Sequence, residues 1–462
     1  MGHHYISEIQ DEKFEFTSKS RIMLTVILVI GLALAGIGAM KAKSHWAEHS
    51  SPAAAHHQAD DHAPAAAQAE VHEHEAASTT AHADAEHASG SHHHEKSWIT
   101  QLWANILLNS YYFMLFTVGA LFFIAVNYAA NAGWSTLVKR VAEAITGYLP
   151  VAFITLTAVV ILGKGELYHW YQYLSQGLKE GDAGYDAILS GKTWFLNNSS
   201  FTIGVPVIIG VWILFRYVLR KASINEDQIG GEANFKKSIK FSAGFIAFFA
   251  FSFSILSWML MMSIDAHWFS TIFSIYNFAI AFVTGLTVIM FFTLYLKSKG
   301  YLEVVSDEVI HDLGKFMFAF SIFWGYIWIS QFLLIWYANL PEETLYFDAR
   351  LTPHYKPLFL INIAMNFALP FLILMMRNAK RAPKVILVAG SIILLGHWLD
   401  VYLMVMPGTV GEMADIGLLE IGSTMVFAAI FIYVVLQSLT KASLITKNHP
   451  YVLESANHDV GV

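Results

Sequence analysis

Residues 384–406 read KVILVAGSIILLGHWLDVYLMVM, an apolar stretch interrupted by His397 and Asp400. At about 1.5 Å per residue, a helix of this length crosses a hydrocarbon core of about 30 Å. His397 then lies near the midplane, and Asp400 lies one turn nearer the far surface on the same helix face. A charge at that depth costs about 2.5–3.5 kcal/mol on insertion scales and by default marks a proton or substrate path. The stretch therefore predicts a membrane helix that carries a functional pair.

The composition of the whole chain is also that of a membrane protein. Of its 462 residues, 56% are hydrophobic and 14% are charged, whereas about a quarter are charged in soluble proteins. The absence of cysteine excludes iron–sulfur ligation, c-type haem attachment and disulfides. Any redox centre with thiolate ligands must therefore belong to a partner.

Apolar runs long enough to cross a membrane occur ten times, which predicts an all-α polytopic membrane protein. The predicted spans are 22–40, 106–130, 145–162, 201–215, 241–264, 269–296, 316–338, 358–376, 385–406 and 416–439. Asp11, Glu12 and Glu15 precede the first span, so we interpret it as an uncleaved anchor rather than a signal peptide.

Basic residues predict the orientation of the spans. With the amino terminus inside, 20 of the 28 Lys and Arg residues fall in inner segments and 8 in outer loops. The positive-inside rule then places both termini in the cytoplasm. We expect a multi-pass protein of the bacterial inner membrane.

The segment 45–100, between the first two spans, is made largely of Ala, His and acidic residues, and twelve of the 21 histidines lie between His45 and His94. Its hydrophobicity is too low for a core, which predicts a disordered loop in the periplasm. Neutral imidazoles such as those of His92, His93 and His94 bind Zn, Cu or Ni. The segment is either a metal-gathering loop or a solvated linker.

A short repeat favours an internal duplication. Phe-Thr-Val-Gly ends at Gly119 in the second span, and Phe-Val-Thr-Gly ends at Gly285 in the sixth; Ser257-Trp and His397-Trp form a weaker pair. We expect two four-helix bundles with one flanking helix on each side, unless the glycines serve only close helix packing. The predicted division is 1–44 (tail and first anchor), 45–100 (loop), 101–268 (first bundle), 269–406 (second bundle) and 407–462 (tenth helix and tail).

A group of titratable residues is predicted on the outer side of the membrane. Its members are Glu166, His169, Asp265, His267 and Glu420. Carboxylates and imidazoles are suitable proton carriers, so with His397 and Asp400 they could line an outward half-channel. Alternatively, the outer residues are wetted helix ends, and His397 and Asp400 satisfy each other through a structural hydrogen bond.

The seventh span carries a polar and aromatic stripe formed by Tyr326, Ser330, Gln331 and Tyr337. Three of these fall near helical spacing, on a face that could hydrogen-bond a proton chain or contact a quinone. Aromatic stripes also arise from simple packing.

The run FWGYIWISQFLLIWYANLPEE at residues 323–343, the turn SIDAHWFS at 263–270 and Gly-His-Trp at 396–398 carry a resemblance over essentially the whole chain. It resembles the NrfD or polysulfide-reductase membrane-subunit superfamily. Within that superfamily it is most similar to the ActF subunits of alternative complex III, the quinol:cytochrome c oxidoreductase of Bacteroidetes-type respiratory chains.

The resemblance implies a respiratory membrane subunit without haem or metal of its own, which offers a proton path and a scaffold rather than catalytic residues. The implied partners are multihaem and monohaem c-type cytochromes, an iron–sulfur subunit and a related quinol-binding membrane subunit. Whether this subunit itself binds quinone or menaquinone stays open. The predicted spans agree with the expectation that this subunit binds no haem. A bis-histidine haem needs two imidazoles deep in the membrane, and only His397 is predicted to lie deep. The alternatives are a free-standing secondary transporter and a structural membrane anchor.

Overall fold

The computed structural model describes residues 12–49 and 96–458, and all regular structure in these ranges is helical. Ten stretches of this part of the chain are long and apolar enough to cross a membrane, which confirms the predicted all-α polytopic class. Eight are single helices: α2 (Ser18–His49), α4 (Trp98–Ala129), α10 (Asn198–Ile229), α11 (Glu232–Leu260), α12 (Phe273–Ser298), α13 (Asp307–Ala338), α17 (Pro383–Thr409) and α18 (Leu418–Leu439). The third combines α5 (Lys139–Ile145), α6 (Leu149–Ala158) and α7 (Lys164–Leu167), and the eighth combines α15 (Lys356–Ile363) and α16 (Leu369–Leu374).

Each predicted span falls on one of these helices, and the structure mainly lengthens the helices beyond the apolar runs. The fourth is the clearest case, because Asn197 accepts a hydrogen bond from the Ser200 amide and starts α10 before its apolar run. At the other end, α10 continues through polar residues to the turn at Gly230 and Gly231, whose positive φ values of 70° and 75° favour glycine. α10 and α11 therefore form a helical hairpin longer than its membrane-spanning part.

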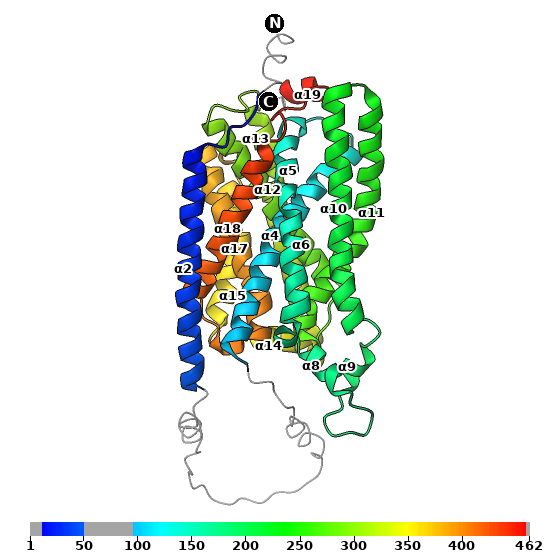
Figure 1. Cartoon of the computed structure of the whole chain (residues 1–462), viewed down its shortest axis with the longest axis vertical. Coiled ribbons are helices and arrows are strands. Elements are labelled where there is room, and N and C mark those ends of the chain that lie inside the picture. The colour runs from blue at the N-terminus through cyan, green and yellow to red at the C-terminus, as the bar shows by residue number, and fades with distance from the viewer. Residues whose placement is uncertain (1–11, 50–95, 459–462) are drawn as a thin grey trace, which may run out of the picture.

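The helices stand side by side in one elongated bundle (Figure 1). α4 packs against α6, α11 and α12, whereas α12 also packs against α13 and α17; α15 and α16 lie on α17. α18 packs on α4 and carries α2 on its outer side. We call the end of the bundle at which α2 begins and α18 ends the terminal face. The opposite end, with α8 (His169–Gln176), α9 (Ala187–Gly191) and α14 (Pro341–Leu351), is the loop face (Figure 1).

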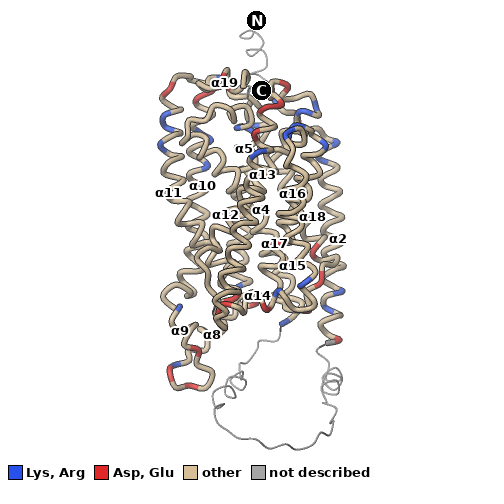
Figure 2. Tube along the Cα trace, turned by 180° about the vertical axis from the view of Figure 1, so that it is seen from behind, with Lys and Arg blue, Asp and Glu red and all other residues tan. Residues whose placement is uncertain are grey.

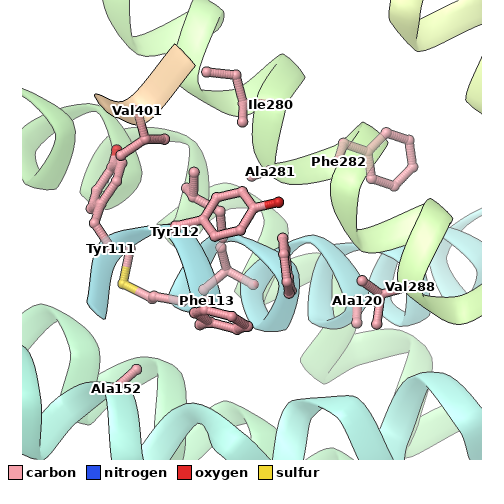
Figure 3. Packing of buried hydrophobic residues seen from close by; sticks show 14 of the residues in the cluster. Tyr111, Tyr112, Phe113, Ala120, Ala152, Ile280, Ala281, Phe282, Val288 and Val401 are labelled. Carbon is pink, nitrogen blue, oxygen red and sulfur yellow. The ribbon is translucent and has the colours of Figure 1, made fainter. Parts of the chain in front are cut away.

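The two copies of the short repeat meet where α4 crosses α12. A Cβ added to Gly119 on α4 would lie 1.9 Å from the carbonyl oxygen of Ala281, and one added to Gly285 on α12 would lie 2.8 Å from the Gly119 carbonyl carbon. Figure 3 shows the surrounding apolar side chains, among them Tyr112, Phe113 and Phe282. Small residues permit this approach, and dispersion contacts between the backbones stabilise it.

Lys and Arg are concentrated toward the terminal face (Figure 2). Several of them are buried rather than solvated, which composition alone did not indicate. Arg140 is 2% exposed; it donates to Glu143 Oε2 at 2.7 Å and also to Asp227 on α10. Arg220 donates to the same Glu143 carboxylate. These ion pairs tie α5 to α10, and breaking such a pair from one side costs about 3–5 kcal/mol.

The carboxy-terminal tail folds back over the terminal face. The amide of Lys447 donates to Asp227, the hydroxyl of Ser455 on α19 (Val452–Ala456) donates to the carbonyl of Trp134, and His458 pairs with Asp312 at 2.8 Å. His449 is buried, and its Nδ1 accepts a hydrogen bond from the Tyr451 amide. A ring nitrogen that accepts is unprotonated, so the docked tail holds a neutral imidazole.

We expect the docked tail to loosen as the pH falls below about 6.5. Burial, assisted by the nearby Lys139 charge, lowers the pKa of His449 to about 2. The undocked histidine binds a proton near pH 6.5, so acid favours the undocked form by about 1.4 kcal/mol per pH unit. Hydrogen exchange of residues 447–457, corrected for intrinsic rates, should therefore accelerate between pH 6.5 and 4.5. His449→Phe, which cannot titrate, should flatten this dependence; an equal slope in both proteins would refute the assignment.

Most of the predicted His-rich loop lies outside the described residues. α2 continues to His49 and α4 begins at Trp98, so the predicted loop 45–100 is helical at both of its ends. Residues 50–95, including His92, His93 and His94, lie outside the described residues. In the described ranges no group of three or more His, Asp or Glu side chains is placed to hold a metal ion.

Candidate functional site

Asp400 is the convergence point of four helices. Its carboxylate on α17 is almost fully buried, yet it accepts hydrogen bonds at both oxygens. The donors are the Tyr276 hydroxyl on α12, the Trp324 indole on α13 at 3.0 Å and the Asn362 amide on α15 at 3.0 Å. An ionised carboxylate only accepts, so three donors directed at one group match its charged form.

His397 lies one turn away and has a different environment. It is fully buried, with its ring against the edge of Trp324 at 5.5 Å between centroids. Its Nδ1 stands 3.6 Å from Asp400 Oδ2, too far for a direct hydrogen bond. Within the described part of the chain, neither ring nitrogen has a hydrogen-bond partner. The two residues therefore do not satisfy each other, and a buried imidazole with both nitrogens unpaired requires an explanation.

A small cavity extends the site from Asp400 toward the loop face. Its volume is about 20 Å³, enough for a single water, which needs about 10–15 Å³. Asp400, Tyr276, Asn362, Gln331 and Arg350 supply polar groups to its walls. A water at this point would have the several polar partners that buried waters require.

Arg350, on α14, forms the far wall of the cavity and connects it to the surface. Its guanidinium donates to the Leu403 carbonyl at 2.7 Å, to the Tyr346 carbonyl at 2.6 Å and to Asp265 Oδ2 at 3.0 Å, and it lies 3.4 Å from the Tyr346 ring centroid. Burial raises the pKa of Tyr346 to about 12, although the guanidinium opposes this. Asp265 is partly exposed at the loop face. A series of polar groups therefore leads from Asp400 through the cavity and Arg350 to Asp265, and His397 lies beside its inner end.

The structure places the other predicted loop-face residues in separate clusters. His267 Nε2 lies 2.5 Å from Asp186 Oδ2, and the His267 and His169 rings are 6.5 Å apart. Glu166 accepts from the Thr100 hydroxyl at 2.9 Å. Of the predicted group, Asp265 is joined to the cavity beside Asp400, through Arg350.

Glu420 occupies its own buried position between α18 and α4. Its Oε1 accepts from Gln101 at 2.9 Å and from Asn105 at 3.0 Å, while its Oε2 accepts from the Gly417 amide at 2.9 Å. The last contact caps the start of α18. Helix capping and helix packing account for all of these bonds.

The polar and aromatic stripe of α13 divides between two faces. Tyr326 is 65% exposed and Tyr337 is 87% exposed, so both face away from the bundle, and Ser330 is half-buried beside them. Gln331 is buried and lines the small cavity. The stripe therefore contributes one residue to the interior site.

Sequence reasoning missed Tyr276, Asn362 and Arg350, and it placed Trp324 in the aromatic run of the seventh span without connecting it to Asp400. Arg350 had a signal, because it is the one arginine in the predicted outer loops, where every other basic residue is lysine. An arginine is suited to a buried site because it keeps its charge and donates in several fixed directions. The three neutral donors had no such signal among many other aromatic and amide residues.

Comparison with known proteins leaves the family open. No protein-family model matches the chain, and no curated protein matches it either. The resemblance to respiratory membrane subunits therefore rests on the residues quoted above, and function must be argued from the site.

Proposed function

We propose that this protein is an integral membrane subunit of a respiratory quinol:cytochrome c oxidoreductase, in which it provides a proton path and a scaffold rather than redox centres. The observation that carries the proposal is the buried Asp400 carboxylate, bound by donors from three other helices and followed by a polar chain to Asp265. Ionisable groups inside a membrane bundle are rare, and they mark ion and proton pathways by default.

His397 and Asp400 are proposed to exchange the proton, because each can carry one and they lie 3.6 Å apart. Arg350 keeps its charge and is proposed to position Asp265 and stabilise negative charge at the outer end of the chain. The iron–sulfur and c-type haem centres are assigned to partner subunits, since a chain without cysteine supplies no thiolate for them.

A free-standing transporter is the alternative of a different class. Transporters bind substrate at discontinuous helices in matching positions of two halves. The described chain has π-helical turns at Val159–Gly163 in the third span and Ala364–Ala368 in the eighth. The third span is the second helix of the first predicted bundle, whereas the eighth span is the third helix of the second. The two irregular turns therefore do not lie in matching positions and do not support a transporter.

Purification from the native membrane tests the proposal. A mild-detergent preparation should bring down c-type cytochromes that stain for haem and an iron–sulfur protein, identified by mass spectrometry. A stable haem-free preparation with none of these partners, obtained from membranes that retain cytochromes, would refute the respiratory assignment.

The orientation can be tested cleanly because the natural chain contains no cysteine. Ala183 on the loop face and Ala233 on the terminal face are both exposed. We expect a membrane-impermeant maleimide to label Ala183→Cys in spheroplasts and Ala233→Cys only after lysis, since the terminal face is proposed to be cytoplasmic. The reverse pattern would overturn the orientation and place Asp265 on the cytoplasmic side.

A further inference from the structure

A second hollow in the described chain shares no lining residue with the small cavity beside Asp400. A cleft of about 850 Å³ lies between α2, α4, α12, α17 and α18. Apolar side chains from all five helices line it, represented by Leu24, Phe116, Phe291, Leu395 and Ala428. Its volume falls in the range of about 300–1,000 Å³ that is typical of ligand sites.

The cleft opens sideways, toward the surrounding bilayer. Leu395 and Met23 line it and are 61% and 57% exposed, and α2 borders it from outside the bundle. In a membrane the surrounding medium is hydrocarbon, so an apolar recess that opens to this medium is filled by acyl or isoprenoid chains rather than by water.

The cleft is lined mainly in the half of the bundle nearer the terminal face, where α2 and α12 contribute to it. α12 contributes residues from Val288 to Ser298, the half nearer the terminal face, and α2 contributes Ser20 to Ile27, again from that half. Phe116 and Leu395 bound the cleft near the middle of their helices. α18 lines the cleft from Ile416, at the loop face, to Leu436, so a chain that enters at the terminal face can extend past the middle of the bundle.

Polar and basic groups stand at the interface end. Ser20, Tyr295 and Ser298 line that end of the cleft. Lys299 follows Ser298, and its Nζ lies 5.9 Å from the Tyr295 ring centroid. Lys384 lies one helical turn before Leu387, which also lines the cleft, and both lysines are exposed.

We infer that the cleft binds an anionic phospholipid of the leaflet at the terminal face, with its acyl chains between α2, α12, α17 and α18. Its phosphate lies among the basic residues at the interface end. The apolar walls fit the acyl chains, and Lys299 and Lys384 select for negative charge because basic residues at this depth attract anionic lipids. The lipid fills the gap beside α2 and stabilises the attachment of that helix.

Native mass spectrometry tests the inference on the full chain in its purified complex. After exchange into mixed phosphatidylglycerol and phosphatidylcholine vesicles and detergent extraction, we expect one retained phosphatidylglycerol per copy. Ala428→Phe, which fills the cleft, should lower retention at least ten-fold. Ile154→Phe, on the exposed face of α6, is the matched control and should retain the lipid.

The charge selectivity has its own test, which does not depend on packing. The surface double variant Lys299→Gln with Lys384→Gln should lower the preference for phosphatidylglycerol by about five-fold per lysine. Equal retention of both lipids by the natural protein would overturn the inference, as would a retained quinone that Ala428→Phe displaces. Absence of any retained lipid in the complex would also overturn it and indicate a protein helix from a partner in the cleft.

Discussion

Asp400→Asn is expected to reduce proton transfer through this subunit at least ten-fold while the complex still assembles. The amide keeps the size of the carboxylate but cannot take up a proton at physiological pH, and positioned proton-transfer groups typically contribute about 10²–10⁴ in rate. At the native position the amide nitrogen would face one of the three donors, Tyr276, Trp324 or Asn362. That mismatch costs about 1–3 kcal/mol, less than is needed to unfold a packed bundle.

Proteoliposomes that contain the purified complex provide the measurement, as protons moved per electron at matched haem content. Asp415→Asn makes the same chemical change at an exposed position on the loop face and should leave proton movement unchanged. If both Asp400→Asn and His397→Ala moved protons normally, the site would be structural. A scaffold would then be the better account of the subunit.

Gly119→Ala is expected to prevent accumulation of the folded chain or to destabilise it severely. The new methyl group would sit 1.9 Å from the carbonyl oxygen of Ala281, a backbone atom that cannot rotate away. Inserting atoms into a packed core costs about 1–3 kcal/mol where side chains can adjust, and more where backbone must move. α4 and α12 would have to separate along the whole seam that joins the two predicted bundles.

Gly210→Ala is the matched control for this change. Gly210 lies inside α10, and a Cβ there has no atom within 4 Å. The substitution should be neutral or slightly stabilising because alanine favours helix over glycine. Folded yield and thermal stability by size-exclusion chromatography compare the two variants. Equal behaviour of the two would show that the crossing is less tightly packed than these distances indicate.

The spans and the deep pair could be predicted because their signals are local in the sequence. Ten apolar runs gave ten helices, and His397 and Asp400 stood out by depth alone. The repeat ending at Gly119 and Gly285 was also visible, although only the structure brings the two glycines into contact.

The partners of Asp400 could not be predicted, because hydropathy does not say which face of a helix turns inward in a bilayer. Lipid and protein interior are similarly apolar, so Tyr326, exposed, and Trp324, buried two positions earlier, look alike in sequence. Arg140 presented the opposite problem. The positive-inside rule treats it as loop charge, whereas the fold buries it in ion pairs.

The pairing of α2 with α18 has a consequence for biogenesis. The two helices touch through small residues: a Cβ on Gly38 would lie 2.3 Å from the Leu419 nitrogen, and one on Gly422 would lie 2.3 Å from the Ala35 nitrogen. α2 leaves the ribosome before the other described membrane helices, and its main contact begins at Leu418, roughly 370 residues after α2 ends. At about 5–20 residues per second, translation takes on the order of 20 to 75 seconds to supply that partner. α2 must therefore wait in the bilayer without its main partner, and a span made much later in synthesis is the one that secures it.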